Sequence, residues 1–284
     1  MTRHPRTRGV RDWRMTGPPL AATLERASGA GSWGDIRLFG HAGSPAGPGW
    51  STAAELCSDA SLLDGLLRRF GRECGTEIPQ VTGSLFLKGY LWRVLAPVVA
   101  ALVLERRVPD LGPEGVALRF DGLGFPADLA VGGAFAALPD DPEAGHPNAL
   151  VLASEEDLSR YLAERFAGSH LPGLLAALRP RTRRGLFALR QMAVDAVADA
   201  FLIVGQALDR EEEAVDLAEG VLADPAPLTG PTNYYAVEHD GRRETSRVRN
   251  ACCLYYRLGR DACLTCPRTT RVEKTDEAPE VRSR

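Results

Sequence analysis

The spacing of apolar residues along the chain predicts a mainly helical fold. Leucine, valine and phenylalanine recur every three or four positions in several long segments, which is the pattern of a helix with a buried face. Ser154, followed by Asp157 three positions later, is a signal for the start of one of these helices. Pro97 lies inside another and is expected to kink or divide it. We expect helices over residues 20–27, 52–72, 82–107, from 154 to about 166, 171–178, 182–208 and 211–222.

A smaller set of segments has the alternation and the turn residues of β-structure. Residues 116–120 and 127–131 flank a glycine-containing turn. Residues 234–238 and 243–248 flank Asp240-Gly241, which is a strong signal for a two-residue hairpin turn. The fold class we expect is therefore α+β, a mainly helical body with short β-hairpins and a small C-terminal module.

A change of composition near residues 225–231 separates the helical body from that module. The divisions we expect are a disordered extension (1–18), a helical α+β body (19–228), a C-terminal module (229–267) and a disordered tail (268–284). Met15 is a candidate for the real start of the protein, because the preceding residues are arginine-rich and lack an apolar core.

Composition and charge are those of a soluble globular protein. Hydrophobic residues make up 44% of the 284 positions and charged residues 25%. The net charge is −3, and because residues 1–14 hold five arginines and one aspartate, the rest of the chain is acidic. This balance argues against a nucleic-acid-binding protein. The longest apolar stretch, Val94–Leu104, is too short to span a bilayer. We expect a cytoplasmic protein without a transmembrane segment, and peripheral membrane contact stays open.

Four of the six cysteines lie close together near the C-terminus, as Cys252-Cys253, nine further residues, and then Cys263-x2-Cys266. Zinc ribbons use two C-x2-C pairs, so the adjacent pair suits zinc poorly, whereas a [2Fe–2S] cluster accepts more varied spacing. Disulfides are disfavoured in a reducing compartment. The spacing therefore favours a [2Fe–2S] cluster, with zinc as the alternative. Adjacent cysteines in a strand point to opposite faces, so the chain must bend here, and Gly259 would help it return.

Other chemistry has little support in the sequence. The chain has no Walker A loop and no G-x-G-x-x-G after a predicted strand, so electrons are expected from a separate donor protein. Cys57 and Cys74 are expected to be buried free thiols. Glu211-Glu212-Glu213 is expected to be the acidic first turn of a helix. The histidines have no metal-binding spacing: His4, His41, His146, His170 and His239.

The residues around the cysteines resemble a known family. The stretch Arg249–Leu258, followed by Cys263-Leu264-Thr265-Cys266-Pro267, resembles the C-terminal signature of the FhuF-like siderophore-iron reductases. The segment from Ser84 to Trp92 is similar as well. Members of that family carry a [2Fe–2S] cluster on a C-C-x10-C-x2-C motif, and the present spacing is one residue shorter.

The resemblance implies that Cys252, Cys253, Cys263 and Cys266 hold the cluster, which is the redox centre. It also implies one-electron reduction of a ferric siderophore, with release of Fe²⁺ in the cytoplasm. Nearby cations would stabilise the more negative reduced cluster and dock an anionic chelate or an acidic donor, or they are simply a solvated face. The docking candidates are Arg247, Arg249, Arg257 and Tyr255. Two alternatives remain, a zinc-stabilised interaction protein and an iron–sulfur electron shuttle or sensor.

Overall fold

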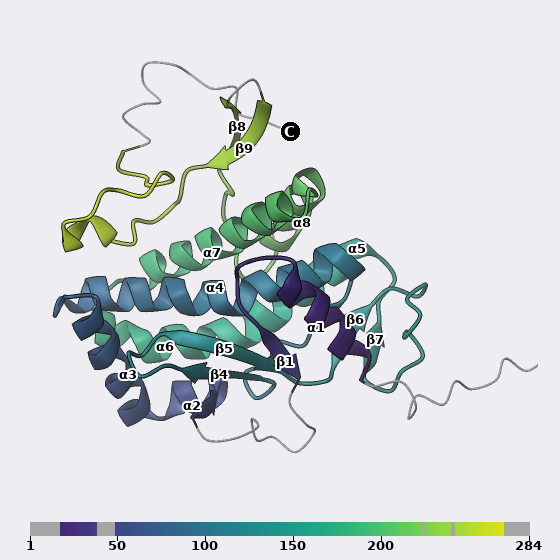
Figure 1. Ribbon diagram of the computed structural model, residues 1–284, viewed down its shortest axis with the longest axis horizontal. Coiled ribbons are helices and arrows are strands. Elements are labelled where there is room, and N and C mark those ends of the chain that lie inside the picture. The colour runs from purple at the N-terminus through teal and green to yellow at the C-terminus, as the bar shows by residue number, and fades with distance from the viewer. Residues whose placement is uncertain (1–17, 39–48, 224, 240–241, 270–284) are drawn as a thin grey trace, which may run out of the picture.

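Two long helices form the centre of the molecule. A computed structural model describes residues 18–38, 49–223, 225–239 and 242–269. Helices α4 (Pro79–Glu105) and α7 (Leu186–Ala207) pack side by side through the middle of the fold (Figure 1). Most of α4 is buried because its residues are apolar on nearly every side, the pattern of a core helix. The predicted disordered ends lie outside the described residues, apart from residues 18, 268 and 269.

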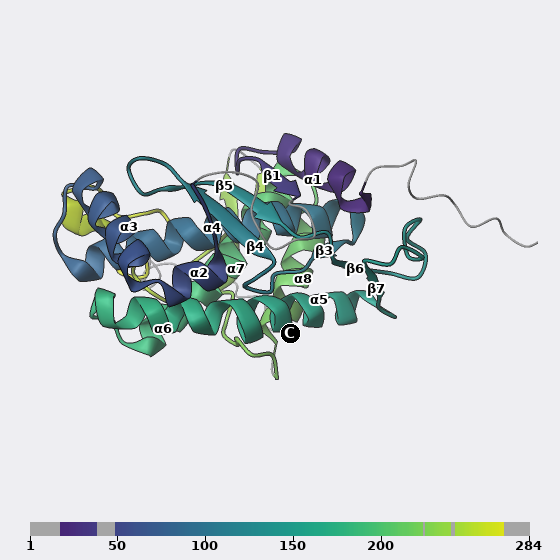
Figure 2. The same ribbon diagram turned by 90° about the horizontal axis from the view of Figure 1, so that it is seen from below.

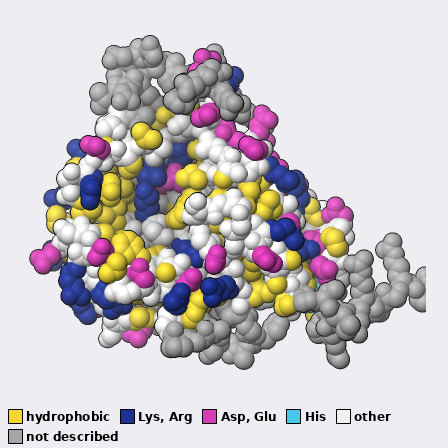
Figure 3. Space-filling view, viewed as in Figure 1, with side chains coloured by type: hydrophobic (Ala, Val, Ile, Leu, Met, Phe, Trp, Pro, Cys, Tyr) yellow, Lys and Arg dark blue, Asp and Glu magenta, His cyan; other side chains and the backbone are white. Residues whose placement is uncertain are grey.

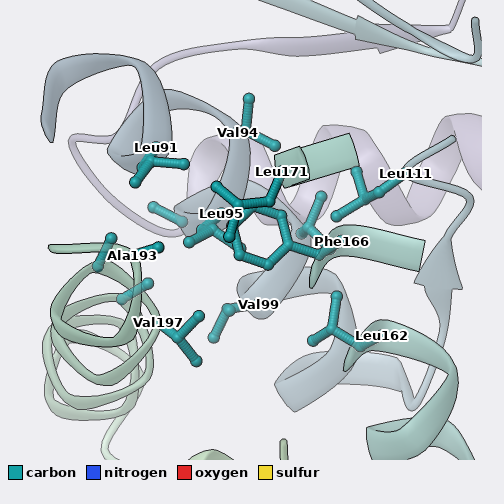
Figure 4. Close-up of a cluster of buried hydrophobic side chains, with 14 of the residues drawn as sticks. Leu91, Val94, Leu95, Val99, Leu111, Leu162, Phe166, Leu171, Ala193 and Val197 are labelled. Carbon is teal, nitrogen blue, oxygen red and sulfur yellow. The ribbon is translucent and has the colours of Figure 1, made fainter. Parts of the chain in front are cut away.

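The main core lies where α4 meets α7 and the helices that follow the sheets. Leu91, Leu95 and Val99 of α4 face Ala193 and Val197 of α7 (Figure 4). The other labelled side chains around them come from α4 and from neighbouring elements: Val94, Leu111, Leu162, Phe166 and Leu171. This packing explains why the long helices are stable without strong caps.

Shorter helices surround this pair. They are α1 (Pro19–Gly29), α2 (Ala53–Ser58), α3 (Ala60–Glu73), α5 (Glu155–Ala163), the π-helix η1 (Glu164–His170), α6 (Leu171–Thr182), α8 (Glu211–Leu222) and the 3-10 turn η2 (Tyr255–Leu258). Helices α5, η1 and α6 follow one another along one edge of the molecule (Figure 2). Pro172 has no N–H to donate to the preceding turn, which accounts for the wider π-turns just before it.

Most helix predictions are confirmed. The side chain of Ser154 accepts a hydrogen bond from the Asp157 N–H at 3.2 Å, which caps α5 as expected. Helix α4 continues through Pro97 as a single helix. The helix predicted over 52–72 is instead two, because Asp59 is extended (φ −89°, ψ 98°) and its side chain caps the start of α3. The Glu211-Glu212-Glu213 run forms the first turn of α8, as predicted.

The strands in the described part of the chain form three small sheets. The four-stranded sheet has the order β1-β5-β4-β2, with β1 (Ile36–Leu38), β2 (Trp50–Thr52), β4 (Val116–Phe120) and β5 (Pro126–Val131). Strand β1 is parallel to β5, while β4 is antiparallel to both of its neighbours. A second sheet has the order β3-β6-β7, with β3 (Val108–Pro109), β6 (Phe135–Ala137) and β7 (Ala149–Val151). The α+β class is therefore confirmed.

The C-terminal hairpin consists of β8 (Tyr234–His239) and β9 (Arg242–Arg247), paired antiparallel. The predicted Asp240-Gly241 turn lies outside the described residues. Within the described part of the chain, α4 is long and apolar enough to cross a membrane by length and composition. This helix is longer than the apolar stretch considered in the sequence, but 78% of the qualifying window is buried inside the fold. Helix α4 is therefore a core helix of this fold.

Candidate metal centre

The four clustered cysteines lie on a loop that starts directly after the C-terminal hairpin. Turn η2 separates the two pairs, and the residues on either side of it, Leu254 and Gly259, have positive φ angles of 65° and 71°. These angles turn the chain back on itself, which places the predicted bend just after Cys253. The Arg249 N–H donates to the Thr265 carbonyl at 3.0 Å, which closes the base of the loop.

The sulfur atoms are grouped as two pairs. The Sγ atoms of Cys253 and Cys263 are 3.9 Å apart, and Cys252 makes a side-chain hydrogen-bonding contact with Cys266. Each adjacent cysteine is thus matched with one member of the C-x2-C pair. All six cysteines are free thiols, and two of the four in this loop, Cys253 and Cys266, are buried.

This grouping fits a binuclear cluster better than a single metal ion. A [2Fe–2S] cluster takes two cysteine ligands on each of its two irons, whereas structural zinc needs four protein ligands around one ion. The chemistry and the pairing of these donors therefore fit the cluster that the spacing favours.

The thiols are held in an electropositive environment. The hydrogen bond from Cys263 lowers the pKa of Cys253 to about 5, and Lys88 and Arg249 act in the same direction. The same hydrogen bond raises the pKa of Cys263. Burial lowers the pKa of Arg184, and the negative charges of Cys252 and Cys253 raise it and so oppose that shift. Cations from three separate parts of the chain therefore surround sulfur atoms that would carry negative charge.

Helix α7 fixes the segment that leads into the cysteines. The buried carboxylate of Asp195 accepts hydrogen bonds from Arg247 Nη2 at 2.6 Å and from the backbone N–H groups of Asn250 and Ala251 at 2.7 and 2.8 Å. Burial raises the pKa of Asp195, and the charge of Arg247 opposes that shift. This one carboxylate therefore ties the helical body to the residue directly before Cys252.

A second carboxylate, one helical turn further along α7, extends this anchor. Asp199 forms ion pairs with Arg247 at 2.8 Å and with Arg249 at 2.6 Å. Arg249 in turn points its Nη1 at the Cys263 sulfur, 3.5 Å away. Residues four apart lie on the same helix face, so Asp195 and Asp199 present a double acidic contact to the Arg247-x-Arg249 segment.

The structure separates the predicted docking residues into two groups. Arg247 is 0% exposed and is fully engaged by α7, so the docking role expected for it is wrong, and it serves as a structural anchor. Arg249 is mostly buried beside the sulfurs, with 12% of its side chain exposed. Arg257 is exposed and Tyr255 is 40% exposed, both on the turn between the cysteine pairs.

Other candidates lie away from this chemistry. The buried His170 contacts the Tyr90 hydroxyl at 2.8 Å and the Leu111 carbonyl at 3.2 Å. A carbonyl only accepts, so Nδ1 of His170 carries the proton and Nε2 accepts from Tyr90. Cys57 is a half-buried thiol whose pKa burial raises to about 11, which leaves it unreactive. His4 and His41 lie outside the described residues.

Sequence reasoning missed four residues of this site: Lys88 on α4, Arg184 before α7, and Asp195 and Asp199 on α7. They lie far from the cysteines in the sequence, and the apolar pattern of α7 indicated only a core helix. The available signal was the pair of carboxylates four residues apart within the apolar part of this helix, residues 192–205.

A cavity opens beside the cysteine loop. It has a volume of about 330 Å³ and is lined by Lys88, Trp92, Ala196, Asp199, Ile203 and Arg249. Figure 3 shows this face hollowed between the C-terminal segment and the central helices, with Lys and Arg side chains on the walls and hydrophobic side chains around the rim. A larger cavity of about 650 Å³ has none of these residues in its walls and includes Asp64, Arg68 and Arg181 instead.

Two family descriptions match the sequence. One, described as the ferric iron reductase FhuF-like transporter, matches residues 84–242, which contain most of α4 and all of α7 and of the hairpin strand β8. The other, described as the FhuF 2Fe–2S C-terminal domain, matches residues 249–268, which contain all four clustered cysteines. A comparison with curated proteins gives no match.

Several solved structures are similar to part of the chain. Aerobactin synthetase IucA from a hypervirulent pathotype of Klebsiella pneumoniae, with ATP bound, has 17% identity and a TM-score of 0.49, over 66% of this chain and 33% of that one. IucC from the same source has 14% identity and a TM-score of 0.45, over 61% and 31%. The petrobactin biosynthesis protein AsbB from Bacillus anthracis has 14% identity and a TM-score of 0.42, over 75% and 34%. The chain spans about a third of the length of these proteins.

Proposed function

The chain belongs to the FhuF-like ferric iron reductase family and carries its C-terminal [2Fe–2S] domain, and we propose that it reduces a ferric siderophore by one electron and releases Fe²⁺ in the cytoplasm. The single observation that carries this proposal is the cation-flanked loop with two sulfur pairs, Cys252 with Cys266 and Cys253 with Cys263, each of which has one buried member. In the same proposal, residues 229–267 are the cluster-bearing module and residues 19–228 the body that supports it.

The chemistry requires little from the protein beyond an electron and a place for the chelate. When bound, the [2Fe–2S] cluster supplies one-electron redox chemistry at the four thiolates. Hydroxamate and catecholate oxygens are hard donors that hold Fe³⁺ far more tightly than Fe²⁺. One electron delivered to the chelated Fe³⁺ therefore gives a weakly held Fe²⁺, and no protein acid or base need take part.

The residues of the chain serve this reaction in two ways. Lys88, Arg184 and Arg249 place positive charge next to the sulfurs, which favours the more negative reduced state. The exposed turn with Tyr255 and Arg257 leaves one side of the loop open to an acidic electron-donor protein. Donor and chelate would thus approach from different sides, the donor at the turn and the chelate at the central face.

The ligand assignment is tested with two matched variants. Cys263→Ser should lose the cluster absorption, acid-labile sulfide and chelate reduction, while the far-ultraviolet circular dichroism of the helical body is retained. Cys74→Ser, at a half-buried thiol outside the loop, should keep all of these properties. A Cys263→Ser protein with wild-type iron and sulfide content would overturn the assignment.

The activity itself is tested with anaerobic protein reduced in a separate step. Such protein should release Fe²⁺ from ferric siderophores, measured with a ferrous-specific chromophore. Transfer of electrons to small dyes at a normal rate, with no faster release of Fe²⁺ than free dithionite gives, would indicate an electron shuttle instead.

A further inference from the structure

We propose that the cavity between α4, α7 and the cysteine loop binds ferric chelates of net negative charge, with Lys88 as the contact that selects them. This inference rests on the proposed reductase function and names the class of substrate that the site prefers. It concerns binding alone, so it can fail while the reductase function stands.

The walls of the cavity combine positive charge with an apolar surface. Lys88, Trp92 and Ile203 contribute from α4 and α7, and Arg249 contributes from the segment before the cysteines. Ile203 is 43% exposed, which is unusual for a large aliphatic side chain on a core helix. A volume of about 330 Å³ accommodates one iron-binding arm of a chelate rather than a whole siderophore.

The balance of charges leaves Lys88 as the free cation. Asp199 is the acidic residue in the wall, and its two oxygens are already engaged by Arg247 and Arg249. Lys88 is exposed and has no ion pair with a carboxylate anywhere in the described part of the chain. The cavity therefore presents a cation that no carboxylate neutralises, which complements an anionic ligand.

The position of the cavity suits electron transfer. Arg249 lines the cavity and also lies 3.5 Å from the Cys263 sulfur. A chelate that contacts Arg249 would be separated from a proposed cluster ligand by a single guanidinium group. The apolar surface of Trp92 would cover the ligand on the side of α4 and exclude water from the contact.

The charge of the cavity selects among chelate classes. Each hydroxamate group brings one negative charge, so three of them leave ferric iron neutral. Chelators with catecholate groups or additional carboxylates leave the complex negative. A positive cavity of this kind should bind the second class more tightly than the first, since the neutral complex gains nothing from Lys88.

The composition of the chain makes Lys88 easy to observe. Only two of its 34 basic residues are lysines, Lys88 and Lys274. Acylation with an amine-reactive ester, followed by peptide mass spectrometry, therefore reports on Lys88 almost alone, with the Lys274 peptide as an internal standard.

The test uses cluster-loaded protein and gallium(III), which has the charge of ferric iron but cannot be reduced under these conditions. A carboxylate-bearing hydroxamate complex of net negative charge is compared with a neutral trihydroxamate complex by titration calorimetry. The anionic complex should bind more tightly and should slow the acylation of Lys88. Lys88→Glu should reduce the ratio of the two affinities by about tenfold, whereas Lys88→Arg should largely preserve it. Arg68→Glu, on the larger cavity, controls for the change in net charge.

The outcomes separate the two proposals. Equal affinity for the two complexes, a ratio that Lys88→Glu leaves unchanged, or acylation of Lys88 that is not slowed by the bound complex would overturn the cavity assignment. If ferric chelates are nevertheless reduced, the proposed function stands. If the anionic gallium complex protects Lys88 but its ferric counterpart is not reduced, the cavity assignment stands and the proposed function falls.

Discussion

Replacement of Asp195 by Asn should detach the cysteine segment from the helical body. The substitution keeps the shape of the side chain but removes its charge and points an amide N–H₂ at groups that are themselves donors. Asp195 and Arg247 are 5% and 0% exposed, so the buried guanidinium would lose one of its two carboxylate partners and keep only Asp199. Breaking a buried ion pair from one side costs about 3–5 kcal/mol when the remaining charge has no partner. Because Asp199 still pairs with Arg247, we expect the low end, about 3 kcal/mol, which at about 1.4 kcal/mol per decade is about a hundredfold change in a docking equilibrium.

The expected result is selective loss of the cluster. During heating, the visible absorption of Asp195→Asn should disappear well before the far-ultraviolet signal of the helices, whereas the two should be closer together in the wild type. Asp216→Asn, at an exposed carboxylate on the neighbouring helix α8, should behave like the wild type. A double variant, Asp195→Asn with Arg247→Met, should recover part of the loss because it also removes the buried guanidinium that lost one of its two carboxylates.

The reasoning fails if the single variant retains its cluster as long as the wild type does. It also fails if the double variant is less stable than the single variant by the full cost of a second independent defect. Either result would mean that the anchor between α7 and the segment before Cys252 does not determine how the cluster is held.

Three further changes have defined outcomes. Arg184→Gln should lower the midpoint potential of the cluster in a redox titration, because a half-buried cation beside Cys252 favours the reduced state; an unchanged potential would remove that role. Burial lowers the pKa of His170 from 6.5 to about 4, so its contribution to stability is present above the unfolded pKa and is lost as pH falls. The ring contacts the neutral Tyr90, and denaturant titrations should show about 2 kcal/mol less stability at about pH 5 than at about pH 7, a loss that His170→Gln should reduce. Gly259→Ala should shorten the lifetime of the cluster severalfold at a cost of about 1 kcal/mol, since φ is 71° there and no neighbour obstructs the methyl group; an unchanged lifetime would show that this turn is not rigid.

The parts of the fold that local signals specify could be predicted. Ser154 caps its helix as its spacing with Asp157 indicates, and the two predicted C-terminal strands, now Tyr234–His239 and Arg242–Arg247, pair with each other. The division at Asp59 was missed, because the apolar pattern continues across it while its side chain starts a new helix. The short strands β1 and β2 were also missed. They have only three residues each, and their partners lie far along the chain.

The candidate site also has a part that local sequence signals predict and a part that only tertiary contacts create. The cysteines are close in sequence, so their spacing alone indicated a cluster and a bend. Lys88, Arg184 and Asp195 reach the same place only because α4 and α7 pack side by side, and no local pattern contains that contact. Arg247 shows the opposite error, since a cation near a metal motif suggests an exposed docking role, whereas only the tertiary structure shows that its partners are buried.

Because Cys252 and Cys253 contact different members of the second cysteine pair, one peptide bond sets the separation between the two halves of the centre. An insertion between these two residues would change that separation directly. The segment from Leu254 to Ala262 contains none of the four proposed ligands, so a change of one residue in its length leaves that separation unchanged. This agrees with the family motif C-C-x10-C-x2-C, in which the two first cysteines stay adjacent while the segment between the pairs is one residue longer.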